Sequence, residues 1–116
     1  MSEIQRILTP YSYASAVAAG EWVFLGLHRG SGDSFHAQLA DTFAGLRRTL
    51  AEFGLPLDSL VKVNVWLKNI EDLPTMEELF RQHFAADKFP ARMTATTAFI
   101  DDDCLLMMDG VAYRGR

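Results

Sequence analysis

A β-strand predicted between two helices is the feature that most restricts how this chain folds. Across residues 61–67, valine or leucine at every second position alternates with more polar side chains, which is the period of a strand. Apolar residues recur at helical spacing over residues 39–53, and a second helical pattern runs over residues 72–84. Strands joined through helices run parallel, so the pattern predicts two crossover connections in a mixed sheet.

Local signals place the ends of both helices. Ser34 is suited to cap the first helix, and Gly54 follows its last apolar residue. Asp72 is the expected cap of the second helix, with Pro74 in its first turn and Phe84 as its last apolar position.

Four further strands complete the predicted order. Residues 14–19 and 22–27 are rich in small apolar and β-forming side chains, and residues 92–100 and 105–113 form a second pair. The resulting order is β-β-α-β-α-β-β in one domain spanning residues 1–116. We therefore predict an α+β fold, with a mixed β-sheet and both helices packed on one of its faces.

The strands are apolar on both faces, although two helices cover only one. Alternation places Trp22 and Phe24 on one side of their strand, and Val23, Leu25 and Leu27 on the other. Sheets that are apolar on both faces are covered on both. A second copy of the chain is the simplest cover, so the sequence predicts a homo-oligomer.

Composition excludes several classes of protein. Apolar residues make up 49% of the 116 and charged residues 22%, which is typical of a folded chain. The net charge of −4 and the absence of a basic run argue against a nucleic-acid partner. With no apolar run of the roughly 20 residues that span a bilayer and no signal-peptide pattern at the start, we expect a cytoplasmic protein without a membrane partner.

Four segments carry a resemblance to a known family. They are Pro10-Tyr11, the strand Leu60–Lys68 (LVKVNVWLK), the run Phe89-Pro90-Ala91-Arg92, and Gly110-Val111-Ala112. Together they resemble the RidA/YjgF family over nearly the whole chain. The resemblance implies a chorismate-mutase-like fold, a homotrimer with clefts between subunits, and hydrolysis of enamines and imines, such as 2-aminoacrylate, to 2-oxo acids and ammonia. It implies no cofactor.

Arg92 is the strongest candidate for a functional residue. Pro90 stiffens the chain that enters its strand, and Arg92 shares a strand face with Thr94 and Thr96. A guanidinium held in this way can pair with a carboxylate through two hydrogen bonds. Residue type alone favours an ordinary surface or interface salt bridge, whereas the resemblance implies the anchor for the substrate carboxylate.

The residues expected to handle water differ from the family pattern. The resemblance implies an active-site tyrosine at Tyr11 and a glutamate in the last strand, where this chain has Met107. Methionine cannot transfer a proton, so another acid must substitute. Glu77, at the family's asparagine position, is the favoured catalytic candidate. Asp109 is the weaker one, because it lies about 6.6 Å along the strand from Met107.

A third group of candidates follows the second strand. The resemblance implies that the backbone of Gly26, Leu27 and His28 contacts the substrate, and Thr94 stands at the family's cysteine position. His28 ends a strand and histidine titrates near neutral pH, although a solvated loop histidine is the favoured interpretation.

No metal site is expected. The three histidines are not at ligand spacing from one another or from Asp101–Cys104, whose acidic part is interpreted as a solvated hairpin tip. Cys104 is not expected to be a reactive thiol, because carboxylates beside it disfavour the thiolate.

These observations leave two functional hypotheses. The first is a hydrolase acting on C–N bonds, which deaminates enamines or imines in a cleft between subunits. The alternative is a trimer that binds 2-oxo acids or similar small carboxylates without turning them over. RNA cleavage is disfavoured by the acidic balance of the chain.

Overall fold

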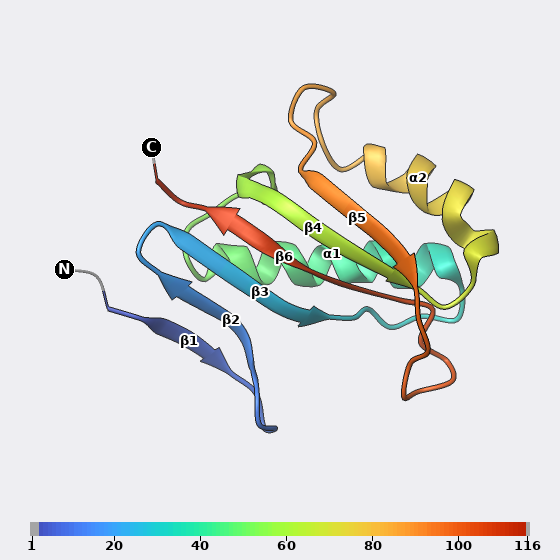
Figure 1. The fold of residues 1–116 in the computed structure, drawn as a ribbon, viewed down its shortest axis with the longest axis horizontal. Coiled ribbons are helices and arrows are strands. Elements are labelled where there is room, and N and C mark those ends of the chain that lie inside the picture. Colours follow the sequence, from blue (N-terminus) through green and yellow to red (C-terminus); the bar gives the residue numbers. More distant parts are fainter. Residues whose placement is uncertain (1–2, 116) are drawn as a thin grey trace.

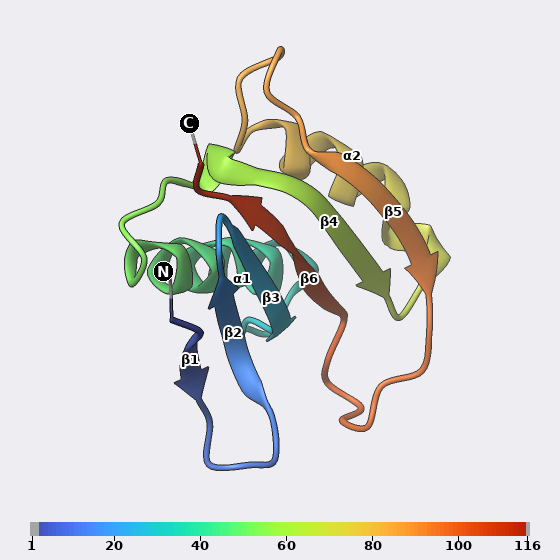
Figure 2. The same ribbon diagram turned by 60° about the vertical axis from the view of Figure 1, so that its left-hand side comes forward.

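The computed structural model describes residues 3–115 and contains a six-stranded mixed sheet with two α-helices on one face (Figure 1; Figure 2). The strands are β1 (Gln5–Leu8), β2 (Ala14–Ala19), β3 (Trp22–His28), β4 (Leu60–Leu67), β5 (Ala91–Thr96) and β6 (Leu106–Tyr113). The helices are α1 (Phe35–Ala51) and α2 (Leu73–Arg81), and short 3-10 turns, Leu57–Ser59 and Ile70–Asp72, precede β4 and α2. The predicted α+β class with two helices is confirmed.

The order of the strands places the last one near the centre of the sheet. The spatial order is β1-β2-β3-β6-β4-β5, in which only β4 and β5 are parallel neighbours. Strands β3 and β4 also run parallel, because each pairs antiparallel with β6 between them. Both predicted crossovers are therefore present: α1 connects β3 to β4, and α2 connects β4 to β5.

Helix α1 begins where the sequence predicted and ends at Ala51, two residues before the last apolar position of the predicted helix, Phe53. The Ser34 hydroxyl accepts a hydrogen bond from the Ala37 N–H at 3.1 Å, which satisfies a donor at the start of the helix. Beyond the last turn, Gly54 has a φ of +70°, a left-handed conformation that favours glycine.

The hydrophobic core fills the space between the sheet and the two helices. Phe43 of α1 meets Phe80 of α2 with ring centroids 5.5 Å apart, so the helices pack on each other as well as on the sheet. The sheet contributes fully or nearly fully buried side chains from four strands: Ala16, Ala18, Val23, Leu25, Val63, Val65, Leu67, Leu106, Met108 and Ala112.

A buried amide joins α1 to the loop between β5 and β6. The Gln38 Nε2 donates to the carbonyl oxygens of Gly32, at 3.0 Å, and Asp103, at 2.8 Å. Its Oε1 accepts from the Leu105 N–H at 2.9 Å. Two of these hydrogen bonds hold the loop between β5 and β6 against the start of α1, and the third holds the segment before α1.

Several predicted boundaries were wrong. Strand β1 was not predicted, because its four residues are mostly exposed and show no apolar alternation. Strand β5 ends at Thr96 rather than residue 100, and α2 ends at Arg81, although Phe84 beyond it is still buried. Asp72 occupies the cap position of α2 but makes no capping hydrogen bond with its side chain.

One prediction about the faces of the sheet was wrong for a definite reason. The register between β3 and β6 shifts between Leu25 and His28, where β3 carries a bulge. The extra residue turns Leu27 to the open face, where it is 40% exposed, and turns His28 inward. A second shift, between Leu60 and Lys62, exposes Val61, which the alternation had placed with the buried residues.

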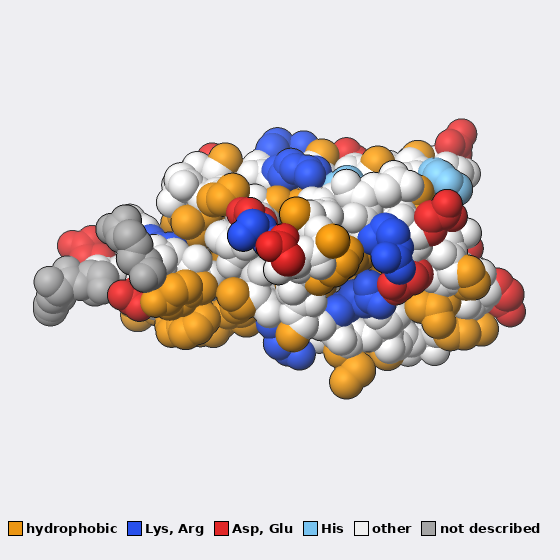
Figure 3. Space-filling model, turned by 90° about the horizontal axis from the view of Figure 1, so that it is seen from above, with side chains coloured by type: hydrophobic (Ala, Val, Ile, Leu, Met, Phe, Trp, Pro, Cys, Tyr) orange, Lys and Arg blue, Asp and Glu red, His pale blue; other side chains and the backbone are white. Residues whose placement is uncertain are grey.

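The face of the sheet opposite the helices is apolar and open. Trp22, Phe24, Leu27 and Met93 project from it with between 40% and 60% of their surface exposed. In Figure 3 hydrophobic side chains gather along the lower margin, which is the face in front of the sheet in Figure 1. Among residues 3–115, neither helix is long and apolar enough to cross a lipid bilayer.

Candidate functional site

Three contacts fix the Arg92 side chain at the edge of the sheet. Arg92 pairs in register with Val63, which is buried under the helices, so it projects towards α2. Its Nη2 forms an ion pair with Glu77, and its Nε donates to the Thr94 hydroxyl at 3.0 Å. The guanidinium carbon lies 4.8 Å from the centre of the Phe80 ring. The prediction that Arg92 and Thr94 share a strand face is confirmed.

Glu77 lies between two arginines. Its Oε1 accepts from Arg92, and its Oε2 accepts from Arg81 at 3.1 Å. These residues line a hollow of about 260 Å³ together with Phe80, Phe89 and Pro90. Two guanidinium groups around one carboxylate leave a net positive charge, so the cluster can attract a small anion.

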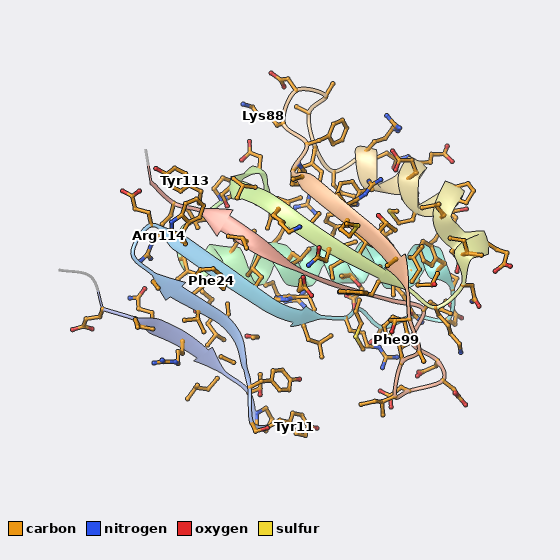
Figure 4. The ribbon with its side chains drawn as sticks, viewed as in Figure 1. Tyr11, Phe24, Lys88, Phe99, Tyr113 and Arg114 are labelled. Atoms are coloured by element: carbon orange, nitrogen blue, oxygen red, sulfur yellow. The ribbon has the colours of Figure 1, made fainter. Side chains whose placement is uncertain are left out.

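A larger pocket lies on the open face of the sheet. It has a volume of about 500 Å³ and is bounded by the end of β3, by β4 and β6, and by the loop after β5 that carries Phe99 (Figure 4). Gly26, Leu27 and Met107 all line it. The fold thus brings together Gly26 and Leu27, two of the predicted substrate contacts, and Met107, which stands where the family pattern has a glutamate.

Among residues 3–115, Asp109 contributes the only charged side chain to the lining of this pocket. Its carboxylate accepts from the Asn64 side-chain amide at 2.7 Å and from the Trp66 indole N–H at 3.1 Å. Within residues 3–115, no arginine, lysine or histidine forms a salt bridge with Asp109. The roles of Asn64 and Trp66 were missed, because they depend on the pairing of β4 with β6.

His28 lies on the helix side of the sheet, outside both pockets. Its Nδ1–H donates to the carbonyl oxygen of Gly26 at 3.0 Å, and its Nε2 accepts from the Thr49 hydroxyl at 2.8 Å. Burial lowers the pKa of His28, and the nearby charge of Arg48 lowers it further. The alternative of a solvated loop histidine was wrong, and the side chain links β3 to α1.

Tyr11 and Arg92 lie at opposite edges of the sheet. Tyr11 sits at the tip of the connection between β1 and β2, where it is 75% exposed and stacked on Tyr13 (Figure 4). Strand β1 forms one edge and β5 the other, so at a spacing of about 4.8 Å per strand they stand roughly 24 Å apart. The two residues do not share a site within one chain.

The acidic run between β5 and β6 is bound to a neighbouring loop rather than merely solvated. Arg29 forms ion pairs with Asp101, at 2.8 Å, and with Asp103, at 3.0 Å. Burial raises the pKa of the adjacent Cys104 thiol, which is fully buried and therefore suited to packing rather than to nucleophilic chemistry. In the part of the chain from residue 3 to 115, no three His, Cys, Asp or Glu side chains are grouped to hold a metal ion.

Comparison with known proteins gives consistent sequence matches. Residues 3–114 match the family described as "Endoribonuclease L-PSP". A RutC family protein of Pyrococcus abyssi is 26% identical over 110 residues, which cover 88% of this chain and 86% of that protein. A protein of Dermatophagoides farinae named 2-iminobutanoate/2-iminopropanoate deaminase is 23% identical over 125 residues, covering 96% of this chain and 97% of its own.

The fold also matches those of solved structures. A hypothetical protein from Streptococcus pyogenes, described as a member of the yjgF family, superposes with a TM-score of 0.90 and 28% identity. The superposition covers 100% of both chains. The six strands and two helices are therefore an arrangement that this chain shares with its relatives.

Proposed function

This chain belongs to the endoribonuclease L-PSP family, which includes the YjgF/RidA proteins, and from that premise we propose that it hydrolyses enamines or imines to 2-oxo acids and ammonia. The observation that carries the proposal is the Arg92 guanidinium, which Glu77, Thr94 and Phe80 hold at the mouth of a small hollow. The relative named an imine deaminase supports this choice of chemistry.

The proposed substrate carries a carboxylate that binds Arg92. A planar guanidinium offers parallel N–H donors to a carboxylate, which both orients and retains a small acid. Thr94 fixes the Nε end of the side chain, so little side-chain freedom is lost when the ligand binds. Arg81 adds a second positive charge beside the hollow.

We place the reaction in a cleft between copies of the chain, in a homotrimer of the chorismate-mutase-like type. Two observations support an assembly. Tyr11 and Arg92 stand at opposite edges of one sheet, so they meet only if they come from different copies. The open face also leaves Trp22, Phe24 and Met93 exposed, and contiguous apolar surface of this kind is typical of interfaces.

The chemistry requires a group that moves protons. Water adds to the imine carbon, and the C–N bond then breaks to give ammonia and the carbonyl. Met107 cannot accept a proton, and Tyr11 of a second copy would contribute a hydroxyl. Glu77 is the acid beside Arg92, but both of its oxygens are already ion-paired with positively charged arginines. This engagement favours positioning of Arg92 over proton transfer as its main role.

The alternative is a metabolite-binding trimer without turnover. Met107 in the place of the family's glutamate favours it, because the site would then keep its anchor and lack its proton carrier. The family's description also names an endoribonuclease. A net charge of −4 does not favour the phosphate contacts on which RNA binding depends.

The test is ammonia release from enzymatically generated 2-aminoacrylate. We expect the wild-type protein to accelerate release, the Arg92→Ala variant to lose at least nine tenths of the acceleration, and the exposed-site control Arg47→Ala to retain it. Equal rates for wild type and Arg92→Ala would refute the hydrolase. Saturable binding of 2-oxobutyrate without turnover, lost in Arg92→Ala, would establish the alternative. Light scattering at micromolar concentration tests the trimer, and a monomer would contradict it.

A further inference from the structure

The pocket on the open face contains a carboxylate that the fold orients but does not neutralise. Asn64 and Trp66 each donate one hydrogen bond to Asp109, and both donors are uncharged. These bonds direct the carboxylate without balancing its charge. No salt bridge to Asp109 occurs within residues 3–115. A partly buried, oriented carboxylate of this kind attracts a cation or a strong hydrogen-bond donor.

Most of the remaining pocket wall is apolar, with Thr97 as a further polar side chain. Leu27 and Met107 line it from the sheet, and Phe99 and Ile100 line it from the loop after β5. Its volume of about 500 Å³ is of the size that holds small ligands. The bulge in β3 creates part of this wall, since it turns Leu27 to the open face. The loop side is held in place through Gln38 and its hydrogen bonds to residues 103 and 105.

We propose that this pocket binds a small organic cation that carries a large apolar side chain, with Asp109 as its counter-charge. The apolar wall takes the side chain, and the carboxylate takes the N–H group. Charge therefore selects the cationic end of the ligand, and the apolar wall selects its side chain. The site is separate from Arg92, which lies on the other side of the sheet in the same chain.

In the proposed reaction, on which this part of the inference rests, the cation is the iminium group of a substrate whose carboxylate binds Arg92 of a neighbouring copy, because the two groups lie on opposite sides of the sheet within one chain. Water bonds to the iminium carbon while one of its protons passes to Asp109, giving a neutral carbinolamine. Asp109 then returns that proton to the nitrogen, and the C–N bond breaks with its electron pair leaving on ammonia. The remaining hydroxyl proton passes to the ammonia, so that iminium and water become a 2-oxo acid and ammonium.

The binding test uses 3-methylbutylammonium, which has a cation and a branched apolar tail but no carboxylate. The Trp66 indole N–H resonance reports on the site, because that group donates to Asp109. The indole of Trp22, at the far end of β3, is the internal reference. We expect saturable shifts of the Trp66 signal in both wild type and Arg92→Ala.

Matched variants separate charge from apolar contact. Asp109→Asn should weaken binding of the ammonium about fivefold or more and leave binding of the uncharged 3-methylbutan-1-ol unchanged. Ile100→Ser should weaken both ligands, whereas Ile70→Ser, another exposed isoleucine outside the pocket, should weaken neither. Absence of saturable binding, or equal ammonium affinity in wild type and Asp109→Asn, overturns the inference.

A substrate series distinguishes this inference from the proposed function. Imines generated by an amino-acid oxidase from leucine and phenylalanine should be hydrolysed at least fivefold faster than the imine from alanine. Asp109→Asn should lose this turnover while retaining the affinity for 4-methyl-2-oxopentanoate, which has no nitrogen. Hydrolysis of the alanine imine as fast as the others would refute the inference and keep the proposed function. Binding of 3-methylbutylammonium without hydrolysis of any imine would refute the proposed function but leave the inferred cation-binding pocket supported.

Discussion

Replacing Glu77 with glutamine should strengthen the binding of small carboxylates at Arg92. In the native protein the Glu77 carboxylate occupies one side of the guanidinium and carries the same sign of charge as the ligand. Glutamine keeps the shape of the side chain, and its amide oxygen can still accept from Arg92. Thr94 and Phe80 retain their own contacts to the arginine. The substitution therefore removes a charge without removing the support for the guanidinium.

The size of the effect follows from distance and exposure. A carboxylate paired with Arg92 would stand about 5 Å from the Glu77 carboxylate, and a site of this exposure has an effective dielectric constant of about 40. The side chains of Arg92 and Glu77 are 24% and 44% exposed, which supports a value between those of water and the interior. The repulsion removed is then about 1.5 kcal/mol, or roughly tenfold in affinity.

Calorimetric titration with 2-oxobutyrate measures this affinity apart from catalysis, because the acid is a product and does not react. Glu78→Gln is the matched control, since it makes the same change of charge at the next, exposed position of α2. We expect Glu77→Gln to bind about tenfold more tightly and Glu78→Gln to change by less than twofold. Unchanged or weaker binding in Glu77→Gln would refute the competition between Glu77 and the ligand.

Two further predictions concern stability. Gly30→Ala should destabilise the fold by about 2 kcal/mol or more, because a Cβ there would lie 2.4 Å from a backbone oxygen of α1. Gly45→Ala should stabilise the helix by about 0.5–1 kcal/mol, because the nearest side-chain atom to a Cβ at this position is 3.6 Å away. Urea denaturation measures the free energy of unfolding of both variants, and a change of the same sign in both would contradict this account. Stability should also fall as the pH drops below about 6.5, since burial keeps the pKa of His28 low and the unfolded chain then binds more protons. His28→Gln should remove the part of this pH dependence that His28 contributes and leave the part from His83, whose pKa burial also lowers.

The helices were predictable because their signals are local. Ser34 caps a neighbour three residues away, and the apolar positions of α1 recur within the helix itself. The crossover order could also be predicted, since it depends only on the sequence of elements. Strand β1 was not predictable in this way, because its residues are held by pairing with β2 rather than by their own pattern.

The site was harder to predict because it depends on register. One bulge exchanged the faces of Leu27 and His28, and simple alternation contains no signal for such a shift. Arg92 and Thr94 were placed together correctly, since they lie two residues apart on one strand. Asp109 and Trp66 are separated by 43 positions in the chain, and only the pairing of β6 with β4 brings them into one pocket.

The central place of β6 has a consequence for biosynthesis. Strands β3 and β4 leave the ribosome with the edges that will face each other still unoccupied, because the strand between them is translated after all the others. Until it emerges, the nascent chain exposes backbone donors and acceptors that can pair with other polypeptides. Truncation within residues 106–113 would therefore split the sheet into two parts instead of trimming its margin, and such products should aggregate or be degraded.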